Sequence, residues 1–532
     1  MNGGALDEAA VAGDQQRMAT LKRILRTLFQ RWEAVLELAF GQKNNPVVNL
    51  GALGWYFFWI AAGTGIYLYI FFDTGITNAY ASVEYMTHDQ WYAAGVMRSL
   101  HRYSSDALVV VVFLHILREF SLDRLRGRRF FAWITGVPAL WLIYICGISG
   151  YWLIWDKLAQ YIAIATTEWL DTLPFFGEPI ANNFLNSTTL SNRFFTLMVF
   201  IHIFAPLFLL FLMWLHIQRH ARARVNPPKP LAVGTAVCLL SLSLVYPAVS
   251  QGPADLDTVP ATLQLDWYYL LAYPLLDVIP GGTLWLVLAI GTLFLALLPW
   301  VPPIKPAPVA VVSLNNCNGC GRCVEDCPFS AITMQPRSDG MAFDAEAVVL
   351  ADNCMSCGIC AGACPTSTPF RRARELVPGI ELPDHSIAGL RERTLAAATR
   401  MNGATRVMVF ACDRAGAEVL SGPDTQVITM PCVAMLPPAF IDFALSRRLA
   451  EGVMLAGCAE GDCYFRLGDE WTRQRLAGQR DPYLRSRVPR ERLVTSWLPG
   501  ASGQRRQHAL SQFIRALRAL PKTDNVGTDP DE

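Results

Sequence analysis

The sequence predicts a multidomain membrane protein: an α-helical transmembrane bundle of about six spans, then a ferredoxin-like α+β domain, then a small α/β domain. Three observations predict this class. The first 302 residues contain six long apolar segments, hydrophobic residues make up 52% of the chain against 17% charged residues, and twelve of the fourteen cysteines follow Asn316. The net charge of +1 gives no reason to expect a nucleic-acid partner.

The apolar segments lie near residues 50–72, 96–117, 131–155, 195–217, 231–249 and 282–301. Each approaches the ~20 residues that a membrane-spanning helix needs. Basic residues concentrate in the connections after the second and fourth segments, so the positive-inside rule places both termini in the cytoplasm. We therefore expect a multi-pass protein of the inner (cytoplasmic) membrane of a prokaryote. A basic amphipathic helix before the first span is expected to lie on the cytoplasmic membrane surface.

Shifts in composition divide the chain into seven parts. We expect an N-terminal amphipathic segment at 1–49, a four-helix core at 50–230, two further membrane helices with a long loop at 231–302, a cysteine-dense domain at 303–376, a linker at 377–403, a second cysteine-containing domain at 404–490, and a C-terminal helix with a disordered tail at 491–532. Prolines between residues 299 and 308 predict a stiff connection into the soluble region, and we expect disorder from about Asp524. The sequence has no GxGxxG or P-loop motif, so we expect nucleotide binding to fall to a partner.

Histidines recur at a matched interval on two of the apolar segments. His101 and His115 are fourteen residues apart on the second segment, and His202 and His216 repeat that interval on the fourth. Fourteen residues are close to four helical turns, so each pair lies on one helix face, ~21 Å apart along the axis. The two segments run in the same direction, so His101 can meet His202 near the outer leaflet and His115 can meet His216 near the inner one.

Two stacked b haems with bis-imidazole ligation would engage all four histidine rings. A single membrane histidine is more often a hydrogen-bonded polar group, but that alternative does not account for two pairs with equal spacing. Glycines support the haem interpretation: Gly51 and Gly65 on the first segment are fourteen residues apart, as are Gly136 and Gly150 on the third. Glycine in a spanning helix allows a flat macrocycle or another helix to approach closely. Helix packing alone would not require the same interval.

Two cysteine runs, "CNGCGRCVEDCP" and "CMSCGICAGACP", share the spacing C-x₂-C-x₂-C-x₃-C-P. In two-cluster bacterial ferredoxins the fourth cysteine of each such run ligates the cluster of the other run. The predicted ligands of the first [4Fe–4S] cluster are Cys317, Cys320, Cys323 and Cys364. The predicted ligands of the second are Cys354, Cys357, Cys360 and Cys327. Zinc is the competing assignment, and two complete runs with terminal prolines make it the weaker one.

The remaining cysteines fall into two groups. Four of them follow apolar, strand-like runs or flank a glycine-containing turn: Cys412, Cys432, Cys458 and Cys463. Thiolates converging from strand ends could hold a [2Fe–2S] cluster or zinc, and we favour the cluster. Cys146 and Cys238 have no partner at ligand spacing, so we interpret both as small hydrophobic side chains with a structural role.

Residues from about 30 to 301 resemble cytochrome b of the respiratory and photosynthetic cytochrome bc complexes, with "RSLHRYSSDALVVVVFLHILR" and "HIFAP" among the matching stretches. The resemblance implies that Arg98 and Arg118 pair with haem propionates, and that a quinone site lies near the outer haem. The family lines that site with a Pro-Glu-Trp-Tyr stretch. Here Asp266, Trp267 and Tyr268 take the last three places, so a shorter carboxylate is available to accept a quinol proton.

The soluble region carries two further resemblances. The paired cysteine runs resemble bacterial two-cluster ferredoxins. Residues of about 404–480 resemble the delta subunit of methyl-viologen-reducing hydrogenase through "VFACDRAG", "MPCVAM" and "AGCAEGDCYFRLGDE". The latter resemblance implies a [2Fe–2S] cluster that exchanges electrons with a cytoplasmic flavoprotein of heterodisulfide-reductase type, which would bind FAD and NAD(P).

These features together predict a membrane-bound electron-transfer subunit of a quinone-dependent oxidoreductase. It would link the flavoprotein to the quinone pool through one [2Fe–2S] cluster, two [4Fe–4S] clusters and two b haems. One alternative is an electron-transfer subunit of a hydrogenase or heterodisulfide-reductase-like complex. Another is a redox sensor or scaffold without quinone turnover. A homodimer is one option for the assembly of the chain.

Overall fold

The computed structural model describes residues 3–174, 185, 190–218, 224–301, 308–371, 376–500 and 502–520. The chain forms two compact units. The first, here called the helical unit, comprises Met1–Phe29 and Asn44–Ile304; the second, here called the cysteine-rich unit, comprises Gln30–Lys43 and Lys305–Glu532. Most of the expected stiff connection, part of the basic connection after the fourth span, and the expected tail from Asp524 lie outside the described residues.

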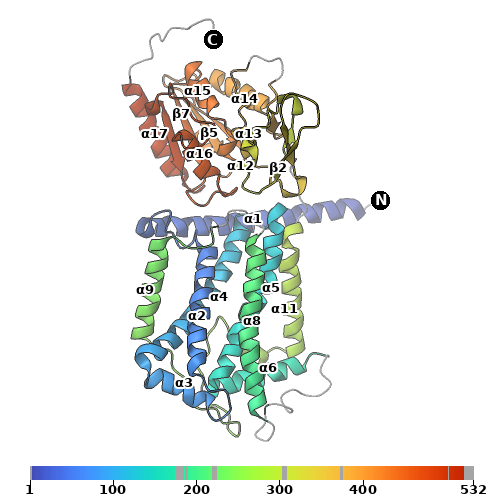
Figure 1. Ribbon diagram of the computed structural model, residues 1–532, viewed down its shortest axis with the longest axis vertical. Coiled ribbons are helices and arrows are strands. Elements are labelled where there is room, and N and C mark those ends of the chain that lie inside the picture. The colour runs from blue at the N-terminus through green and yellow to red at the C-terminus, as the bar shows by residue number, and fades with distance from the viewer. Residues whose placement is uncertain are drawn as a thin grey trace. The chain divides into compact units, whose positions relative to one another are not determined.

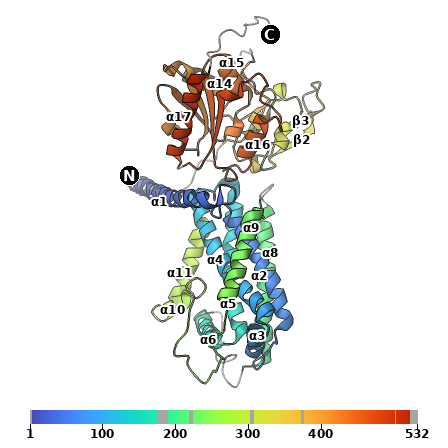
Figure 2. The ribbon, with the colours of Figure 1, turned by 90° about the vertical axis from the view of Figure 1, so that its left-hand side faces the viewer.

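The N-terminal helix and the helices of the helical unit are α1 (Gly3–Phe40), α2 (Leu50–Phe71), α3 (Ala79–His88), η1 (Trp91–Gly95), α4 (Val96–Ser121), η2 (Gly127–Arg129), α5 (Phe130–Ile154), α6 (Lys157–Asp171), α8 (Asn192–Gln218), α9 (Lys229–Val245), α10 (Ala272–Leu276), α11 (Gly281–Leu297) and η3 (Leu298–Trp300). Long apolar runs favour helices here because a helix satisfies its own backbone hydrogen bonds where water is absent. Figures 1 and 2 show the long helices of the unit running side by side.

Five helical segments of the described chain are long and apolar enough to cross a membrane: Leu50–Phe71, Trp91–Ser121, Phe130–Ile154, Asn192–Gln218 and Gly281–Trp300. The remaining apolar segment forms α9, whose 17 residues make it shorter than these five. At the usual helical rise α9 is about 26 Å long, somewhat less than the ~30 Å hydrocarbon layer. Within the bundle, α2 packs against α4 and α5 packs against α8. These two helix pairs carry the glycines and the histidines that the sequence singles out.

The cysteine-rich unit contains short strands and helices from Val311 onward. Its strands are β1 (Val311–Val312), β2 (Ile332–Pro336), β3 (Ala345–Val349), β4 (Ile380–Glu381), β5 (Val407–Cys412), β6 (Thr425–Met430), β7 (Gly452–Gly457) and β8 (Leu493–Trp497). Its helices are η4 (Leu314–Asn316), α12 (Arg322–Glu325), η5 (Ala351–Asn353), α13 (Ile359–Ala363), α14 (Ile387–Arg400), η6 (Glu418–Leu420), η7 (Val433–Met435), α15 (Ala439–Ser446), α16 (Gly468–Leu476), η8 (Arg490–Arg492) and α17 (Gly503–Ala519).

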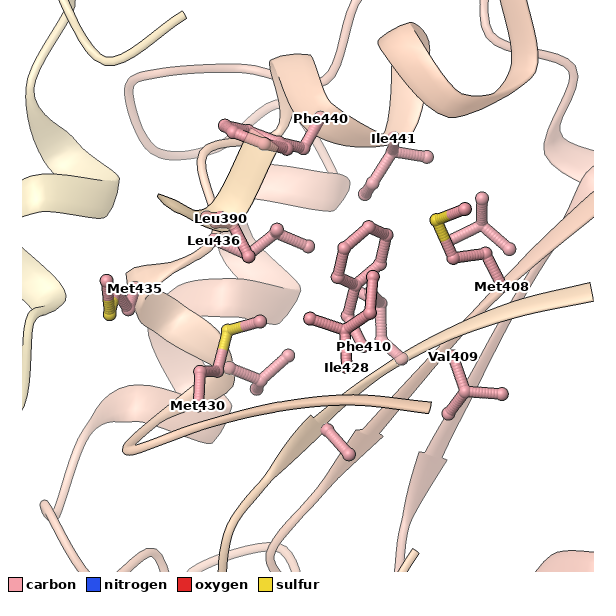
Figure 3. Close-up of a cluster of buried hydrophobic side chains, with 14 of the residues drawn as sticks. Leu390, Met408, Val409, Phe410, Ile428, Met430, Met435, Leu436, Phe440 and Ile441 are labelled. Atoms are coloured by element: carbon pink, nitrogen blue, oxygen red, sulfur yellow. The ribbon is translucent and has the colours of Figure 1, made fainter. Parts of the chain in front are cut away.

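A four-stranded parallel sheet in the order β6-β5-β7-β8 forms the larger part of this unit. Every residue of the two central strands, β5 and β7, is buried. Strands covered on both faces are expected to be continuous hydrophobic runs, and both sequences, VMVFAC and GVMLAG, fit that pattern. Figure 3 shows part of the core, where Phe410 of β5 and Ile428 of β6 lie near Leu390 of α14 and Ile441 of α15.

Two expected boundaries differ from the structure. Residues 377–403, expected to be a linker, contain β4 and α14; β4 pairs with β1, and α14 packs against β6 and buries Leu390. Residues 491–532, expected to hold a helix and a tail, also contain β8, the fourth strand of the sheet. Both segments carry polar residues on their outer faces, which lowers their mean hydropathy and hides their packed faces in the sequence.

Candidate cofactor sites

The first histidine pair, His101 of α4 and His202 of α8, lies against two helical glycines. A Cβ atom placed on Gly65 of α2 would lie 2.9 Å from Cε1 of His101, and one placed on Gly150 of α5 would lie 2.9 Å from Cε1 of His202. Any side chain at these two positions would collide with the imidazole. The centroids of the two rings are 6.1 Å apart.

That ring separation fits two imidazoles on one metal ion. A nitrogen–metal bond is about 2 Å long and a ring nitrogen lies roughly 1 Å from its ring centre, so two imidazoles on opposite sides of a metal place their centroids about 6 Å apart. The Nδ1 atoms are engaged elsewhere: Nδ1 of His101 donates to the carbonyl oxygen of Ala61 at 2.8 Å, and Nδ1 of His202 donates to that of Cys146 at 3.0 Å. A carbonyl oxygen only accepts, so Nδ1 carries the proton and Nε2 keeps its lone pair for a metal.

A hydroxyl group supports each ring of this pair. The Thr64 Oγ1 atom lies 3.3 Å from Nδ1 of His101, and the Ser149 Oγ atom lies 3.1 Å from Nδ1 of His202. Both hydroxyls donate their own proton to carbonyl oxygens of their helix, so their lone pairs face the imidazole N–H. Such outer partners fix the tautomer and ring orientation of a metal-ligating histidine and raise its basicity.

The second histidine pair, His115 of α4 and His216 of α8, repeats the glycine contacts. A Cβ atom on Gly51 would lie 3.3 Å from Cε1 of His115, and one on Gly136 would lie 3.7 Å from Cε1 of His216. The Thr135 Oγ1 atom lies 3.2 Å from Nδ1 of His216. The residue before Gly51 is Leu50, which has no hydroxyl to offer His115. Among the residues that the structure describes, His115 therefore lacks the hydroxyl neighbour that each of the other three histidines has.

Both arginines that the resemblance to cytochrome b assigns to haem propionates are buried beside glutamates. Arg98 donates to the hydroxyl groups of Thr87 and Ser250, and its Nη1 lies 3.7 Å from Glu84. Arg118 is 3% exposed and its Nη1 lies 3.7 Å from Glu119. Each arginine is three residues from a histidine of the same helix, so a cationic group lies close to each histidine pair.

The expected quinone residues occupy different environments. Oδ2 of Asp266 accepts a hydrogen bond from Nη2 of Arg102 at 3.0 Å and another from the hydroxyl of Tyr151. Oδ1 of Asp266 accepts from the backbone N–H of Tyr269 at 2.7 Å. In contrast, the side chain of Trp267 is 70% exposed. The side chain of Tyr268 is half-buried and packs against the core of the helical unit. The carboxylate is thus tied to α4 and α5, and the residue after it faces outward.

The two cysteine runs of the cysteine-rich unit form two cavities, each lined by four cysteines. The first cavity, here called site I, is lined by Cys317, Cys320, Cys323 and Cys364. The second, here called site II, is lined by Cys327, Cys354, Cys357 and Cys360. Each site thus takes three cysteines from one run and the last cysteine of the other run. The four cysteines that line each cavity are those that the spacing groups together, and their role as cluster ligands stays a prediction.

The chemistry of both sites fits metal-bound thiolates. Burial raises the pKa of Cys323 and that of Cys357 to about 12, and it raises the pKa of Cys360 well above the usual thiol value. Free thiols there keep their protons at neutral pH, and metal binding releases those protons because the ligand is the thiolate. The backbone N–H of Ala331 donates to Sγ of Cys327 at 3.1 Å. Hydrogen bonds to ligand sulfurs help to set the potential of a cluster.

The last four cysteines meet at the carboxyl end of the parallel sheet. Cys412 ends β5, while the others follow β6 and β7: Cys432, Cys458 and Cys463. Ligands of open α/β sheets bind at this end, beside the point where the strand order reverses. Here β6 lies on one side of β5 and β7 lies on the other, so this reversal occurs at β5.

These four thiols, here called the thiol ring, lie close together: Cys412 interacts with Cys432 and Cys458, and Cys463 interacts with the same two residues. Hydrogen bonds from Cys412 and Cys463 raise the pKa of Cys432 well above the usual value and lower that of Cys458 well below it. The backbone N–H of Val433 donates to Sγ of Cys412 at 3.1 Å. A [2Fe–2S] cluster takes four such thiolates.

In the part of the chain that the structure describes, no group of three or more His, Cys, Asp or Glu side chains is arranged to hold a single metal ion. Cys146 is partly buried within α5, and Cys238 is exposed on α9. Neither residue lines site I or site II.

Comparison with known families gives three matches in order along the chain. The model for cytochrome b/b6/petB matches residues 36–221, that for the 4Fe-4S dicluster domain matches residues 316–368, and that for the delta subunit of methyl-viologen-reducing hydrogenase matches residues 403–521. The chain carries these three domains. Among solved structures it is similar to one described as "Hyperthermophilic respiratory Complex III", with 19% sequence identity, a TM-score of 0.40, and coverage of 50% of this chain and 80% of that chain.

A cytochrome b domain joined to a 4Fe-4S dicluster domain makes the chain a multi-pass membrane electron-transfer subunit of an oxidoreductase complex, with haem b and [4Fe–4S] clusters as cofactors. The third match includes β8 and α17, so the C-terminal helix belongs to that domain and is not a separate part.

The structure also adds residues that the sequence reasoning missed. Three hydroxyl residues face histidine rings, and each directly precedes one of the four glycines: Thr64, Thr135 and Ser149. That adjacency is visible in the sequence and could have been used. The pairing of Arg102 with Asp266 joins residues 164 positions apart, so only the fold reveals it.

Proposed function

We propose that the chain carries electrons between a cytoplasmic flavoprotein and the quinone pool. The observation that carries this proposal is the set of four helical glycines, each facing a histidine of the neighbouring helix. This arrangement supports two b haems, one between His101 and His202 and one between His115 and His216. Haem and iron–sulfur clusters, when bound, take up and release single electrons.

The cysteine-rich unit would hold three clusters. Site I and site II each offer four thiolates to a [4Fe–4S] cluster, and the thiol ring offers four to a [2Fe–2S] cluster. The match to the delta subunit of a hydrogenase supports a docking partner for this unit. We propose that the partner is a flavoprotein of heterodisulfide-reductase type, which supplies the FAD and NAD(P) sites.

We assign quinone chemistry to the region around Asp266, with Trp267 and Tyr268 beside it. Arg102 and Tyr151 orient the carboxylate of Asp266 through hydrogen bonds, so its position is fixed for an exchange of protons with quinone. Arg102 is the neighbour of His101 in the sequence. This adjacency supports electron exchange between quinone and the first histidine pair rather than the second.

The proposed location is the inner membrane of a prokaryote, with both termini in the cytoplasm. The distribution of basic residues supports this orientation because "REFSLDRLRGRR" and "QRHARARVNPPK" follow spans of the same direction. It places the first histidine pair near the outer leaflet. Cytochrome b helices leave much apolar surface exposed to lipid or to a second copy, so we include a homodimer in the proposal.

Quinol oxidation tests this assignment. The full chain in mild detergent should show haem reduction when a short-chain quinol is added, and Asp266→Asn should slow that reduction by about 100-fold or more, the usual contribution of a positioned acid–base group. Asp257→Asn is the matched control, because Asp257 is an exposed acidic residue of the same loop. Unchanged rates in Asp266→Asn would remove the quinone assignment.

A second candidate function is electron transfer within a hydrogenase or heterodisulfide-reductase complex, and the match over residues 403–521 favours it. Purification of the tagged chain in mild detergent, followed by mass spectrometry of its stoichiometric partners, separates the two. A flavoprotein that reduces the haems with NAD(P)H supports the quinone-linked function. A hydrogenase subunit, together with no haem reduction by quinol, supports the second candidate.

A further inference from the structure

One of the two ferredoxin sites packs directly against the thiol ring. A compact apolar cluster contains Cys357 of site II together with Cys432 and Cys463 of the thiol ring. Phe329 and Met355, which also line site II, pack against the same cluster. None of the residues that line site I belongs to this compact cluster, whereas the larger core cluster contains cysteines of both sites together with Cys412. Site II and the thiol ring therefore share one continuous layer of side chains.

The backbone of the second cysteine run approaches the thiol ring closely. A Cβ atom on Gly362 would lie 2.1 Å from the carbonyl oxygen of Ala434, and one on Gly358 would lie 2.6 Å from Sδ of Met435. Ala434 and Met435 belong to η7, which begins directly after Cys432 of the ring. The helix α13, which carries Cys360 of site II, packs against η7.

The first cysteine run does not repeat this approach, although the two runs share one spacing. Gly321 occupies the position in the first run that Gly358 occupies in the second, and both have a φ of +73°. Nothing lies within 4 Å of a Cβ atom on Gly321. The counterpart of Gly362 in the first run is Glu325. The two cysteine runs therefore differ at the two positions where the second run contacts η7.

A buried arginine joins the same two segments. The side chain of Arg475 on α16 is 1% exposed; its Nη2 donates to Asp326, and its Nη1 donates to the carbonyl oxygen of Ala434 at 2.7 Å. Asp326 directly precedes Cys327, the cysteine that the first run contributes to site II. A buried charge is tolerated only when it is paired and hydrogen-bonded, so this contact fixes the position of both segments.

We infer that site II, and not site I, is the direct redox neighbour of the thiol ring, so that site I exchanges electrons with the ring only by way of site II. Each exchange moves one electron from one centre to the other, and no bond forms or breaks. The inference rests on the proposed function, because it requires clusters at all three sites. It gives the two ferredoxin sites different roles.

Magnetic coupling between reduced centres tests this order without measuring turnover. The full chain in detergent is reduced with dithionite, and electron paramagnetic resonance records the splitting and spin relaxation of the [2Fe–2S] signal. Cys357→Ser removes a ligand of site II, and Cys320→Ser removes one of site I. We expect the coupling to be lost in Cys357→Ser and retained in Cys320→Ser. The opposite result, or equal loss in both variants, overturns the inference.

A glycine pair provides a test that leaves every cysteine in place. Gly358→Ala and Gly321→Ala impose the same backbone strain because the two φ angles are equal, but only the first places a methyl group against Met435. We expect weaker coupling in Gly358→Ala and unchanged coupling in Gly321→Ala, with full iron content in both. Equal coupling in the two variants contradicts the inference. If the unaltered chain lacks a [2Fe–2S] signal, the proposed cluster assignment itself fails. Failure of the proposed function can thus be distinguished from failure of the inference about site II.

Discussion

The histidine sites and the cysteine sites are built in different ways. Each histidine pair needs four helices, because a glycine helix and a histidine helix meet on each side, as Gly65 with His101 and Gly150 with His202 show. The two ferredoxin sites are assembled from short loops, and three of the four cysteines of each come from one run. A helical site therefore depends on helix packing over long sequence distances, whereas a ferredoxin site depends mostly on local backbone geometry.

The largest expected effect is the loss of one haem when one histidine is removed. His202→Ala takes away half of the ligation of the first pair while leaving α8 intact, so haem content should fall from two to one per chain. Pyridine haemochrome spectra of the purified protein measure this. His508→Ala, which removes an exposed histidine of α17, should keep both haems. If His202→Ala kept both, the histidines would not be the ligands.

Larger side chains at the glycines should show whether these positions are needed for the histidine sites or only for helix packing. Gly65→Val pushes a side chain into His101, because even a Cβ atom would lie 2.9 Å from its ring. We expect loss of most of the haem at the first pair, measured by absorbance per protein. Gly63→Val on the same helix is the control, since nothing lies within 4 Å of a Cβ atom there. Equal loss in both variants would show that α2 packing, and not the imidazole contact, is at stake.

Removal of one ring cysteine should leave the helical unit unaffected. Cys412→Ser is expected to lower non-haem iron by about two atoms per chain, because a [2Fe–2S] cluster needs four cysteine ligands. Haem content should not change. Cys238→Ser, at the exposed cysteine of α9, should change neither value. Elemental analysis of the unaltered chain provides the contradicting outcome: zinc bound at the thiol ring instead of iron would argue against the [2Fe–2S] cluster.

The smallest expected effect concerns the hydroxyl groups. Leu50→Thr would give the site of His115 the residue type that supports the other three histidines. A hydrogen bond donated by Nδ1–H to the new hydroxyl makes the imidazole a stronger electron donor to the iron and favours oxidised iron, so the potential of the second haem should fall. A net hydrogen-bond energy of about 1 kcal/mol corresponds to a few tens of mV for one electron. Thr64→Val should raise the potential of the first haem, and potentiometric titration measures both shifts.

The sequence predicted the sites that depend on spacing. The fourteen-residue interval places His101 beside His202, and the fourth cysteine of each run joins the other run in the structure. The convergence of Cys412 and Cys432 followed from their positions after apolar strand-like runs. In all these examples the signal is a repeated interval or a local motif, which helical or turn geometry converts directly into position.

Features that depend on packing between distant segments were not predicted. The polar sequence of α14 gave the appearance of a linker, although Leu390 lies in the core. The contact of Gly358 with Met435 and the bridge of Arg475 to Asp326 join segments 77 and 149 residues apart. No periodicity within either segment encodes such a partner, because the partner is chosen by the fold as a whole.

The most direct test of the account is a count of haems and of their ligands in the same sample. Pyridine haemochrome analysis of the full chain, purified in mild detergent, should give two b haems per chain, and electron paramagnetic resonance of the oxidised protein should give two low-spin signals typical of bis-histidine ligation. One haem per chain, or a haem with only one histidine ligand, would contradict it.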